Sequence, residues 1–582
     1  MKELKKLNRL FIKYKWQLIG GIIVTIISRY LSLYLPKYVG KIINLLNDYS
    51  NGERTDIDVV QDELLLYIGI IIGSTLLAAG LTFIMRQLII VVSRHLEYDL
   101  KNIIYVQYQK LSLGFYKKNR TGDLMNRISE DVSKVRMYMG PAIMYTINMV
   151  TLFAVVIPAM IETAPTLALY TLLPLPFLSI AIYVVSREIH KRSTLVQQYL
   201  SNLNTISQEA FSGISVIKAY NLAPQMNTQF AQVANDSKEK NIDLARIQAL
   251  FFPMMVLLIG LSNILVIYIG GRQVIAGEIE VGAIPEFLIY VNMLTWPVAV
   301  VGWVTNMIQQ AEASQKRINQ FLDIEPEIQN LMEAHTPVSG SIEFNKVNFT
   351  YEDTNIHALK DLSFKINAGQ TLAILGKTGS GKSTILELIG RLYDVTDGTV
   401  LIDGTPIRDL NLDDLRKSIG YVPQDAFLFS DTIGNNISFG KKDASEEEIK
   451  AAAINAVVHK NIENFTLGYQ TVLGERGITL SGGQKQRVSI ARAIIKKPNI
   501  LLFDDCLSAV DTETEEQILN NLKKVTQNST TIIVSHRVSS AKNADQIIVL
   551  DDGRIIENGS HQSLMEANGY YADLYANQML EQ

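Results

Sequence analysis

Long apolar runs fill the first half of the chain, and none of comparable length occurs in the second half. A helix needs about 20 residues to cross a bilayer, and six runs reach that length. They are residues 16–38, 64–92, 138–160, 166–185, 251–271 and 284–304. Six buried helices of this length would lie far outside the composition of a soluble domain. The pattern therefore predicts a membrane-spanning helical domain over residues 1–320.

The polar connectors between these runs differ in charge. Residues 94–136, residues 187–246 and the N-terminal segment are rich in Lys and Arg, whereas residues 47–63 carry only Arg54 among several acids. Basic loops stay on the cytoplasmic side of a membrane. Both termini are therefore expected in the cytoplasm, with the protein in the plasma (inner) membrane.

Both long cytoplasmic connectors keep a helical pattern. The spans are therefore expected to continue as helices well beyond the bilayer. Each connector ends in a turn-like stretch, at residues 113–122 and 211–221. A long helix that ends in a short polar turn can press on a soluble domain.

A few polar or amphipathic residues interrupt the apolar spans. Arg29 and Arg86 can face a path for an anionic or amphipathic substrate, because a charge inside a bilayer is costly. The favoured interpretation is structural: an ion pair for Arg29, and for Arg86 a side chain that reaches the interface. Trp296 and Trp303 can contact substrate, although lipid-facing or packing roles are more common.

The second half of the chain has a different pattern. Polar residues 321–340, with Pro326 and Pro337, predict a linker. Short apolar strands follow at residues 341–344, 362–366 and 371–375, and helical periodicity appears between later strands. This alternation predicts an α/β domain over residues 341–582.

A glycine-rich loop follows the strand at 371–375. It matches the phosphate-loop pattern G-x-x-x-x-G-K-[S/T], and its residues are Gly376, Lys377, Thr378, Gly379, Ser380, Gly381, Lys382, Ser383 and Thr384. Ile385, Leu388, Ile389 and Leu392 then recur at helical spacing. Backbone N–H groups and a helix N-terminus favour phosphate, Lys382 can reach the outer phosphates, and Ser383 can ligate Mg²⁺. The alternative is a strand-to-helix turn that binds nothing.

Two further segments fit a nucleotide site. Residues 500–504 form an apolar strand that ends in Asp504, where an acid can hold Mg²⁺. Ser481, Gly482, Gly483 and Gln484 open a predicted helix over 484–496, and their glycines make a second anion-binding turn. Tyr351 precedes the phosphate loop, where an aromatic ring can stack on adenine or simply pack.

Composition adds two limits. A net charge of −4 over 582 residues gives no indication of nucleic-acid binding. The single cysteine, Cys506, excludes an intrachain disulfide and suits a reduced compartment.

Over nearly its whole length the chain resembles an ATP-binding cassette (ABC) exporter half-transporter of the lipid or multidrug type. The resemblance rests on an ordered set of motifs: Tyr351, the Walker A loop 376–384, Gln424 in YVPQ, the signature LSGGQ at 480–484, Asp504 of Walker B, the D-loop 508–511 and His536 in VSHR. The implied fold is a six-span helical membrane domain, followed by an α/β P-loop nucleotide-binding domain with antiparallel β and helical subdomains.

The resemblance also implies roles for these residues. ATP would lie between the Walker A loop of one nucleotide domain and the signature of a second, so a dimer is implied. Gln424 would link the Mg-phosphate site to the membrane domain, through coupling elements at 113–122 and 211–221. The implied catalytic residues are Asp505, His536, Gln424 and Lys382, and the implied Mg²⁺ ligands are Ser383, Gln424 and Asp504.

One position departs from the family pattern. The usual glutamate after the Walker B aspartate, which polarises the attacking water, is Asp505 here. In this family, similar replacements occur in subunits whose own ATP site hydrolyses weakly and which pair with a different subunit that carries the glutamate. His536 is retained here, which favours some remaining activity. The sequence is therefore compatible with a homodimer or a heterodimer.

The sequence therefore predicts an ATP hydrolase that exports amphipathic compounds, such as drugs or lipids, by alternating access. The alternative is an ATP-gated channel or a regulatory membrane ATPase that moves no cargo actively. An importer is disfavoured, because family importers usually carry their spans on separate chains. The identity of the cargo does not follow from the sequence.

Overall fold

The computed structural model describes residues 2–580 except 475–476, 478–479, 509 and 526–528. The chain divides into two compact units. The helical unit consists of Met1–Tyr108 and Gly122–Ile324, and the sheet unit consists of Gln109–Thr121 and Glu325–Gln582. The predicted order, helical domain first and α/β domain second, is confirmed.

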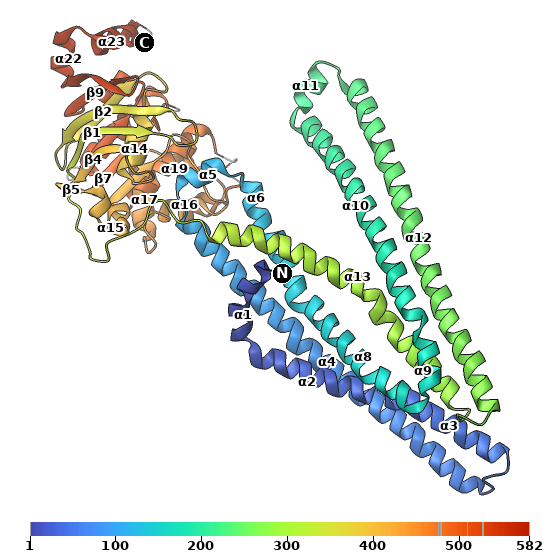
Figure 1. Ribbon diagram of the computed structural model, residues 1–582. Coiled ribbons are helices and arrows are strands. Elements are labelled where there is room, and N and C mark those ends of the chain that lie inside the picture. Colours follow the sequence, from blue (N-terminus) through green and yellow to red (C-terminus); the bar gives the residue numbers. More distant parts are fainter. Residues whose placement is uncertain (1, 475–476, 478–479, 509, 526–528, 581–582) are drawn as a thin grey trace. The chain divides into compact units, whose positions relative to one another are not determined.

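The helical unit is built from long helices joined by short turns (Figure 1). Their bounds are η1 (Glu3–Leu7), α1 (Asn8–Lys13), α2 (Lys15–Leu31), α3 (Tyr34–Ser50), α4 (Ile57–Lys110), α6 (Thr121–Asn126), α7 (Val132–Met137), α8 (Ile143–Thr163), α9 (Pro165–Leu172), α10 (Pro174–Ser212), α11 (Ile214–Ala219), α12 (Ala223–Ile275) and α13 (Ala283–Leu322). Two π-helical turns, η2 (Arg127–Asp131) and η3 (Tyr138–Ala142), flank α7.

Five helical stretches among the described residues are long and apolar enough to cross a bilayer. They are Lys15–Ser50, Ile57–Lys110, Thr121–Thr163, Ala223–Ile275 and Ala283–Leu322. The remaining predicted span, residues 166–185, falls on α9 and the beginning of α10, which Leu173 separates. The count of six spans stays a prediction.

Small residues let the helices of this unit approach closely. A Cβ atom on Gly140 would lie 2.6 Å from the Ser93 hydroxyl oxygen of α4. A Cβ atom on Gly282 would lie 2.0 Å from the backbone oxygen of Gly40 in α3.

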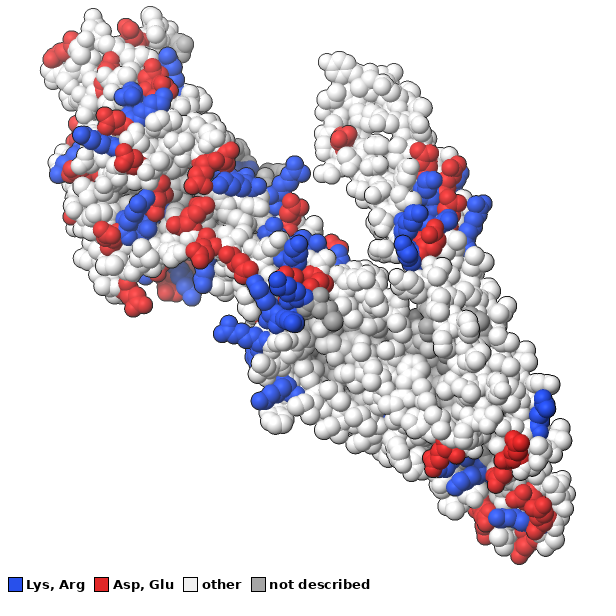
Figure 2. Space-filling view, in the orientation of Figure 1, with Lys and Arg blue, Asp and Glu red and all other residues white. Residues whose placement is uncertain are grey.

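Figure 2 shows a wide uncharged belt over these helices, with the charged residues gathered near their ends. This distribution fits a lipid-facing surface.

Helices α10 and α12 pair as a long hairpin, and α11 closes one end of it (Figure 1). Both helices continue without a break from apolar into polar sequence. The prediction that the spans extend as long helices is therefore confirmed.

The sheet unit contains two β-sheets. The strands are β1 (Ile342–Thr350), β2 (His357–Ile366), β3 (Thr371–Gly376), β4 (Asp397–Ile402), β5 (Thr405–Pro406), β6 (Ile419–Val422), β7 (Ile500–Asp504), β8 (Thr530–Val534), β9 (Gln546–Asp551) and β10 (Arg554–Gly559). The antiparallel sheet has the order β2-β1-β4-β5, and the larger sheet has the order β10-β9-β3-β8-β7-β6. In the larger sheet β10 pairs antiparallel with β9, and the other strands are parallel.

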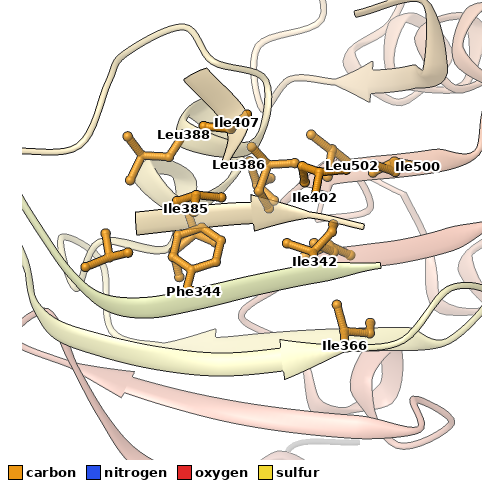
Figure 3. Packing of buried hydrophobic residues seen from close by; sticks show 14 of the residues in the cluster. Ile342, Phe344, Ile366, Ile385, Leu386, Leu388, Ile402, Ile407, Ile500 and Leu502 are labelled. Carbon is orange, nitrogen blue, oxygen red and sulfur yellow. The ribbon is translucent and has the colours of Figure 1, made fainter. Parts of the chain in front are cut away.

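The helices of this unit cover the sheets and form a helical subdomain. They are α5 (Leu113–Lys118), α14 (Lys382–Ile389), α15 (Leu412–Ser418), α16 (Ile433–Ser438), α17 (Glu446–Asn455), α18 (His459–Glu463), α19 (Gly482–Ile494), α20 (Thr512–Val525), α21 (Val538–Ala541), α22 (His561–Ala567) and α23 (Tyr570–Leu580). Figure 3 shows Phe344 of β1 and Ile385 of α14 within one apolar core, which also includes Leu502 of β7. This core fixes α14 directly after β3.

The predicted bounds of two helices are wrong. The helix after the phosphate loop ends at Ile389, because Gly390 caps it and Arg391 takes a left-handed φ of 46°. Leu392 therefore lies outside the helix. The helix predicted at 484–496 spans Gly482–Ile494, since Ser481 caps its N-terminus.

Candidate functional site

The phosphate loop joins β3 to α14 and requires glycine at two close approaches. Gly376 and Gly381 have φ values of 149° and 99°. Their Cβ atoms would lie 2.2 Å from the Leu550 backbone oxygen and 2.5 Å from the Ala358 backbone oxygen. Gly379 also has a positive φ, of 84°, but a Cβ there would meet nothing within 4 Å. The loop therefore packs closely against the backbone at Gly376 and Gly381, whereas the space around Gly379 is open.

Polar groups of the loop point to an anionic ligand. The buried Lys382 ammonium donates to the Gly376 oxygen at 2.9 Å and to the Lys377 oxygen at 2.8 Å. Burial lowers the pKa of Lys382, while Asp505 and Asp504 act in the opposite direction. The buried Ser380 hydroxyl has no hydrogen-bond partner among the described residues. A phosphate fits this loop, because it would offset the charge of Lys382 and give the Ser380 hydroxyl an acceptor.

Strand β7 brings Asp504 beside the start of α14. The Ser383 hydroxyl donates to Asp504 Oδ1 at 2.7 Å. Burial raises the pKa of Asp504, and the Ser383 hydrogen bond opposes this shift. The described residues contain no group of three or more His, Cys, Asp or Glu side chains that could hold a metal alone. A hydroxyl and one carboxylate instead suit Mg²⁺, which also takes phosphate and water ligands.

Asp505 and His536 face each other beside this pair. Asp505 Oδ2 lies 4.0 Å from His536 Nε2, and the Asp505 backbone N–H donates to the Val534 oxygen at 3.0 Å. Asp505 has a left-handed φ of 42°. Burial raises the pKa of Asp505, while His536 and Lys382 pull that pKa down. The next residue, Cys506, is a buried free thiol whose pKa burial raises.

Tyr351 belongs to a different part of the site. Its hydroxyl donates to Glu387 Oε2 at 2.8 Å and lies 3.0 Å from the Thr384 hydroxyl oxygen. Its ring packs edge-on against Tyr393, with centroids 5.5 Å apart. The Lys117 ammonium of α5 lies 4.9 Å from the Tyr351 ring centroid and 3.7 Å from Glu387 Oε1. Tyr351 therefore connects the phosphate-loop helix to α5.

A cavity of about 480 Å³ opens beside Tyr351. Gly114 and Lys118 of α5 line it together with Glu352 and Asp353. Tyr351 lines this cavity, but its lining includes no residue of the phosphate loop. The adenine contact of Tyr351 stays a prediction.

The signature segment stands apart from the phosphate loop. The Ser481 hydroxyl caps α19 and accepts from the Gln484 backbone N–H at 3.4 Å, and Gln484 Oε1 accepts from the Ser481 N–H at 3.0 Å. Ser481 and Gly482 are exposed, and Gly482 has open space around it. In the described part of the chain, 481–484 make no hydrogen bond or ion pair with 376–384. The end of α19 is thus free to face a ligand on another surface.

Gln424 and the D-loop are held by neighbours that the sequence analysis did not identify. The Gln424 side chain is exposed, and its backbone oxygen accepts from the Gln486 amide of α19. Arg537, directly after His536, donates to the backbone oxygens of Ser508 and Val510, each at 3.1 Å. Position 509 of the predicted D-loop lies outside the described residues.

Four neighbours were therefore missed: Glu387, Tyr393, Gln486 and Arg537. Lys117 lies inside the predicted coupling element 113–122, but its contact with Tyr351 was not predicted. Arg537 could have been found from its place beside His536 in VSHR. Lys117 sits more than two hundred residues before its partners, and no local pattern connects it with them.

Comparisons with known proteins cover both units. The model for the ABC transporter transmembrane region matches residues 18–298, and the ABC transporter model matches residues 359–508. The chain is 36% identical over 581 residues to the multidrug resistance-like ATP-binding protein MdlA of Escherichia coli (strain K12), covering 98% of this chain and 97% of MdlA. It is 36% identical over 508 residues to the ATP-dependent lipid A-core flippase of Syntrophus aciditrophicus (strain SB), covering 87% and 84%.

A solved structure is also similar. The structure of a bacterial Atm1-family ABC exporter with ATP bound aligns with a TM-score of 0.77 at 28% identity, over 98% of each chain. The likeness therefore includes both the helical unit and the sheet unit.

Proposed function

This chain belongs to the ATP-binding cassette transporter family, and we propose that it exports amphipathic compounds as one half of a dimer. The family matches make it a multi-pass membrane protein with an ATP-hydrolysing domain. The relatives named for multidrug resistance and lipid A flipping support an amphipathic cargo. Transport would then require that the nucleotide site act on the helices that span the membrane.

One observation carries the proposal: α5, a turn between membrane helices, belongs to the compact unit that holds the phosphate loop. The Ser112 hydroxyl before α5 donates to Glu327 Oε2 at 2.7 Å. Phe115 of α5 is buried, and Lys117 sits against Tyr351 and Glu387. A change of ATP occupancy near Tyr351 would therefore act directly on the segment that connects two spans.

The proposed ATP site uses the loop groups in defined roles. Lys382 would bind the outer phosphates, because an ammonium prefers phosphate oxygens to the loop carbonyls that it now contacts. Ser383 and Asp504 would hold Mg²⁺ together with Gln424, and Mg²⁺ would neutralise developing charge on the phosphates. Asp505 would orient the attacking water, and His536, whose Nε2 lies 4.0 Å from Asp505 Oδ2, would contact the outer phosphate.

Two features support a dimer. The exposed N-terminus of α19 offers anion-binding N–H groups, yet it forms no hydrogen bond or ion pair with the phosphate loop among the described residues. A second half-transporter would place its own signature over this loop. No residue of α11, which the structure describes in full, is buried, and this leaves a second docking element available. The second subunit would be a copy of this chain or an unlike half-transporter.

The proposed orientation places the sheet unit and both termini in the cytoplasm, with the spans in the inner membrane. Lys and Arg are abundant where α4, α10 and α12 extend beyond their apolar parts. Alternating access would result when the sheet units of the two subunits close on ATP. α5 and α11 would transmit this movement to the spans.

The test is ATP-driven accumulation of a fluorescent amphipathic dye in inverted vesicles that contain the full chain. We expect accumulation above the external concentration, and we expect Lys382→Ala to abolish it while the protein stays folded. Dye that only equilibrates across the membrane when ATP is added would overturn active export and identify an ATP-gated channel. Retained transport in Lys382→Ala would remove the phosphate loop from the mechanism.

A further inference from the structure

Both arginines of the apolar spans line one cavity in the helical unit. The cavity has a volume of about 260 Å³ and lies among α2, α4, α8 and α13. Its lining includes Arg29, Arg86, Asn148, Met144, Met149 and Trp296. We call it the arginine cavity. Each of these two apolar spans contains one arginine, and both arginines line this cavity.

The arginine cavity contains positive charge without a carboxylate. No Asp or Glu lines it, and within the described residues neither Arg29 nor Arg86 forms an ion pair. Arg29 Nε donates to Asn148 Oδ1 at 3.1 Å, which is a bond to a neutral amide. The ion pair expected for Arg29 is not among those of the described residues, and the neutral amide of Asn148 does not offset the charge of the guanidinium.

Arg29 also lies inside the apolar run 16–38 that is predicted to span the bilayer. It follows Lys15, the first residue of α2, by 14 residues, which corresponds to about 21 Å along a helix. A charge at this depth usually serves an ion or substrate path, because it is costly to keep there.

The apolar part of the lining suits a flexible chain. Met144 and Met149 come from α8, and methionine adapts its shape to irregular ligands. Trp296 of α13 is 69% exposed, so its ring is available for contact. Trp303, the other tryptophan of this span, instead packs against Tyr145 with ring centroids 5.3 Å apart.

We propose that the arginine cavity binds the anionic head group of an amphiphile, with its apolar chain against the methionines and Trp296. The guanidinium groups of Arg29 and Arg86 would bind phosphate, sulfate or carboxylate oxygens through paired N–H donors. A cationic amphiphile of the same length is disfavoured by two uncompensated positive charges. The inference rests on the proposed export function and names the class of its cargo.

The test measures binding rather than transport. The transporter, in its working assembly, is placed in nanodiscs of phosphatidylcholine. Dodecyl phosphate and dodecyltrimethylammonium then form a matched pair with the same chain and opposite charge. We expect Arg29→Gln/Arg86→Gln to weaken dodecyl phosphate binding about tenfold or more, because charged hydrogen bonds are lost. Binding of dodecyltrimethylammonium should stay equal or improve.

Two variants control for general damage. Arg272→Gln removes an exposed arginine at the end of α12, away from the lining, and should leave both affinities unchanged. Arg29→Lys keeps the charge but loses the paired donors, so it should retain part of the anion preference. If the double variant does not fold, as judged by size-exclusion chromatography, Arg86→Gln alone takes its place and should lose part of the anion affinity.

Equal loss for both amphiphiles, or no loss for the anion, would overturn the proposal. Inorganic phosphate that displaces dodecyl phosphate at micromolar concentration would also overturn it, since the apolar chain would then contribute nothing. Binding of the predicted kind without ATP-driven accumulation in vesicles would instead contradict the export function and leave the site intact. The two failures are thereby distinguishable.

Discussion

Two short helices, α5 and α11, each close a pair of long helices, yet their surroundings differ. Each has six residues. α5 keeps Phe115 buried, and Leu111 and Ser112 before it are buried as well. None of the six described residues of α11 is buried, and the aromatic rings beside it, Phe211 and Tyr220, are 76% and 75% exposed. Both turns carry apolar side chains, but only those at α5 are buried within this chain.

The difference supports the proposed dimer, in which α11 would contact a surface of the second half-transporter. Large exposed aromatic side chains in one turn are typical of an interaction site. Since α5 belongs to the sheet unit of its own chain, the equivalent position for α11 is the sheet unit of a second half-transporter. Each chain would then act on two nucleotide sites.

The strongest test is to remove the apolar surface of α11. Phe211→Asp/Tyr220→Asp should lower transport on the order of 100-fold, because charges would replace two aromatic anchors of the proposed contact with the second subunit. Folding should change by about 0.5 kcal/mol or less, since both side chains are exposed. Transport in vesicles and thermal unfolding measure the two effects.

The matched control is Asn204→Asp, which adds a charge to an exposed position of α10 without touching the turn. It should transport at the parent rate. Parent-level transport by the double variant itself would make α11 an ordinary solvent-exposed turn and remove the contrast with α5.

A second test compares one substitution in both places. Phe115→Ala should cost about 3 kcal/mol of local stability, because a buried ring is lost. Amide hydrogen exchange in α5 should then become on the order of 100-fold faster. Phe211→Ala should leave exchange in α11 nearly unchanged. Similar effects at both sites would show that the two turns are equally packed.

Asp505→Glu asks whether the two nucleotide sites of the assembly are alike. Aspartate holds its carboxylate about 1 Å further back than glutamate, and such a displacement is costly for orienting water. We expect Asp505→Glu to raise ATPase activity of a purified homodimer at least about tenfold, with little change in ATP affinity. Asp505→Asn should lower whatever activity exists.

A neutral or harmful Asp505→Glu in a competent homodimer would mean that the left-handed backbone at Asp505, with φ of 42°, already brings the shorter side chain forward. A chain that neither dimerises nor turns over ATP in either form would indicate an unlike subunit with the glutamate. In that assembly Asp505→Glu would create a second hydrolytic site.

The smallest effect is expected at Lys117 of α5. Lys117 contacts the Tyr351 ring and Glu387, so Lys117→Met should raise the KM for ATP about threefold. The control is Lys110 at the end of α4, which is exposed and forms no ion pair among the described residues, so Lys110→Met should leave the KM unchanged. An equal change in KM for both variants would mean that the effect of Lys117→Met comes from the loss of a positive charge and not from its contact with Tyr351.

The phosphate loop could be predicted from local sequence alone, whereas the roles of Gln424 and His536 were implied only by the family resemblance. The strand, the glycine loop and Lys382 follow one another, so local pattern was enough to find them. The contact of Lys117 with Tyr351 depends on tertiary folding and left no local signal. The end of α14 was misplaced because Leu392 fits the helical period, whereas the backbone turns at Gly390 and Arg391.

The span arginines show the other limit. Sequence alone shows that Arg29 is unusual for an apolar span. An arginine is expected there both for a structural ion pair and for a cavity that binds substrate, so the residue type does not distinguish the two. Only the neighbouring amide of Asn148 and the shared lining with Arg86 separate the two interpretations.

The burial of Cys506 makes the natural chain a ready background for thiol chemistry. Its thiol is 1% exposed, and burial keeps it protonated and unreactive toward maleimides. A cysteine introduced at Asn51, in the turn after α3, or at Lys238 of α12 would therefore be the sole reactive thiol. With membrane-impermeant reagents, the two positions should react from opposite faces of the bilayer, and labelling from one face would overturn the proposed topology.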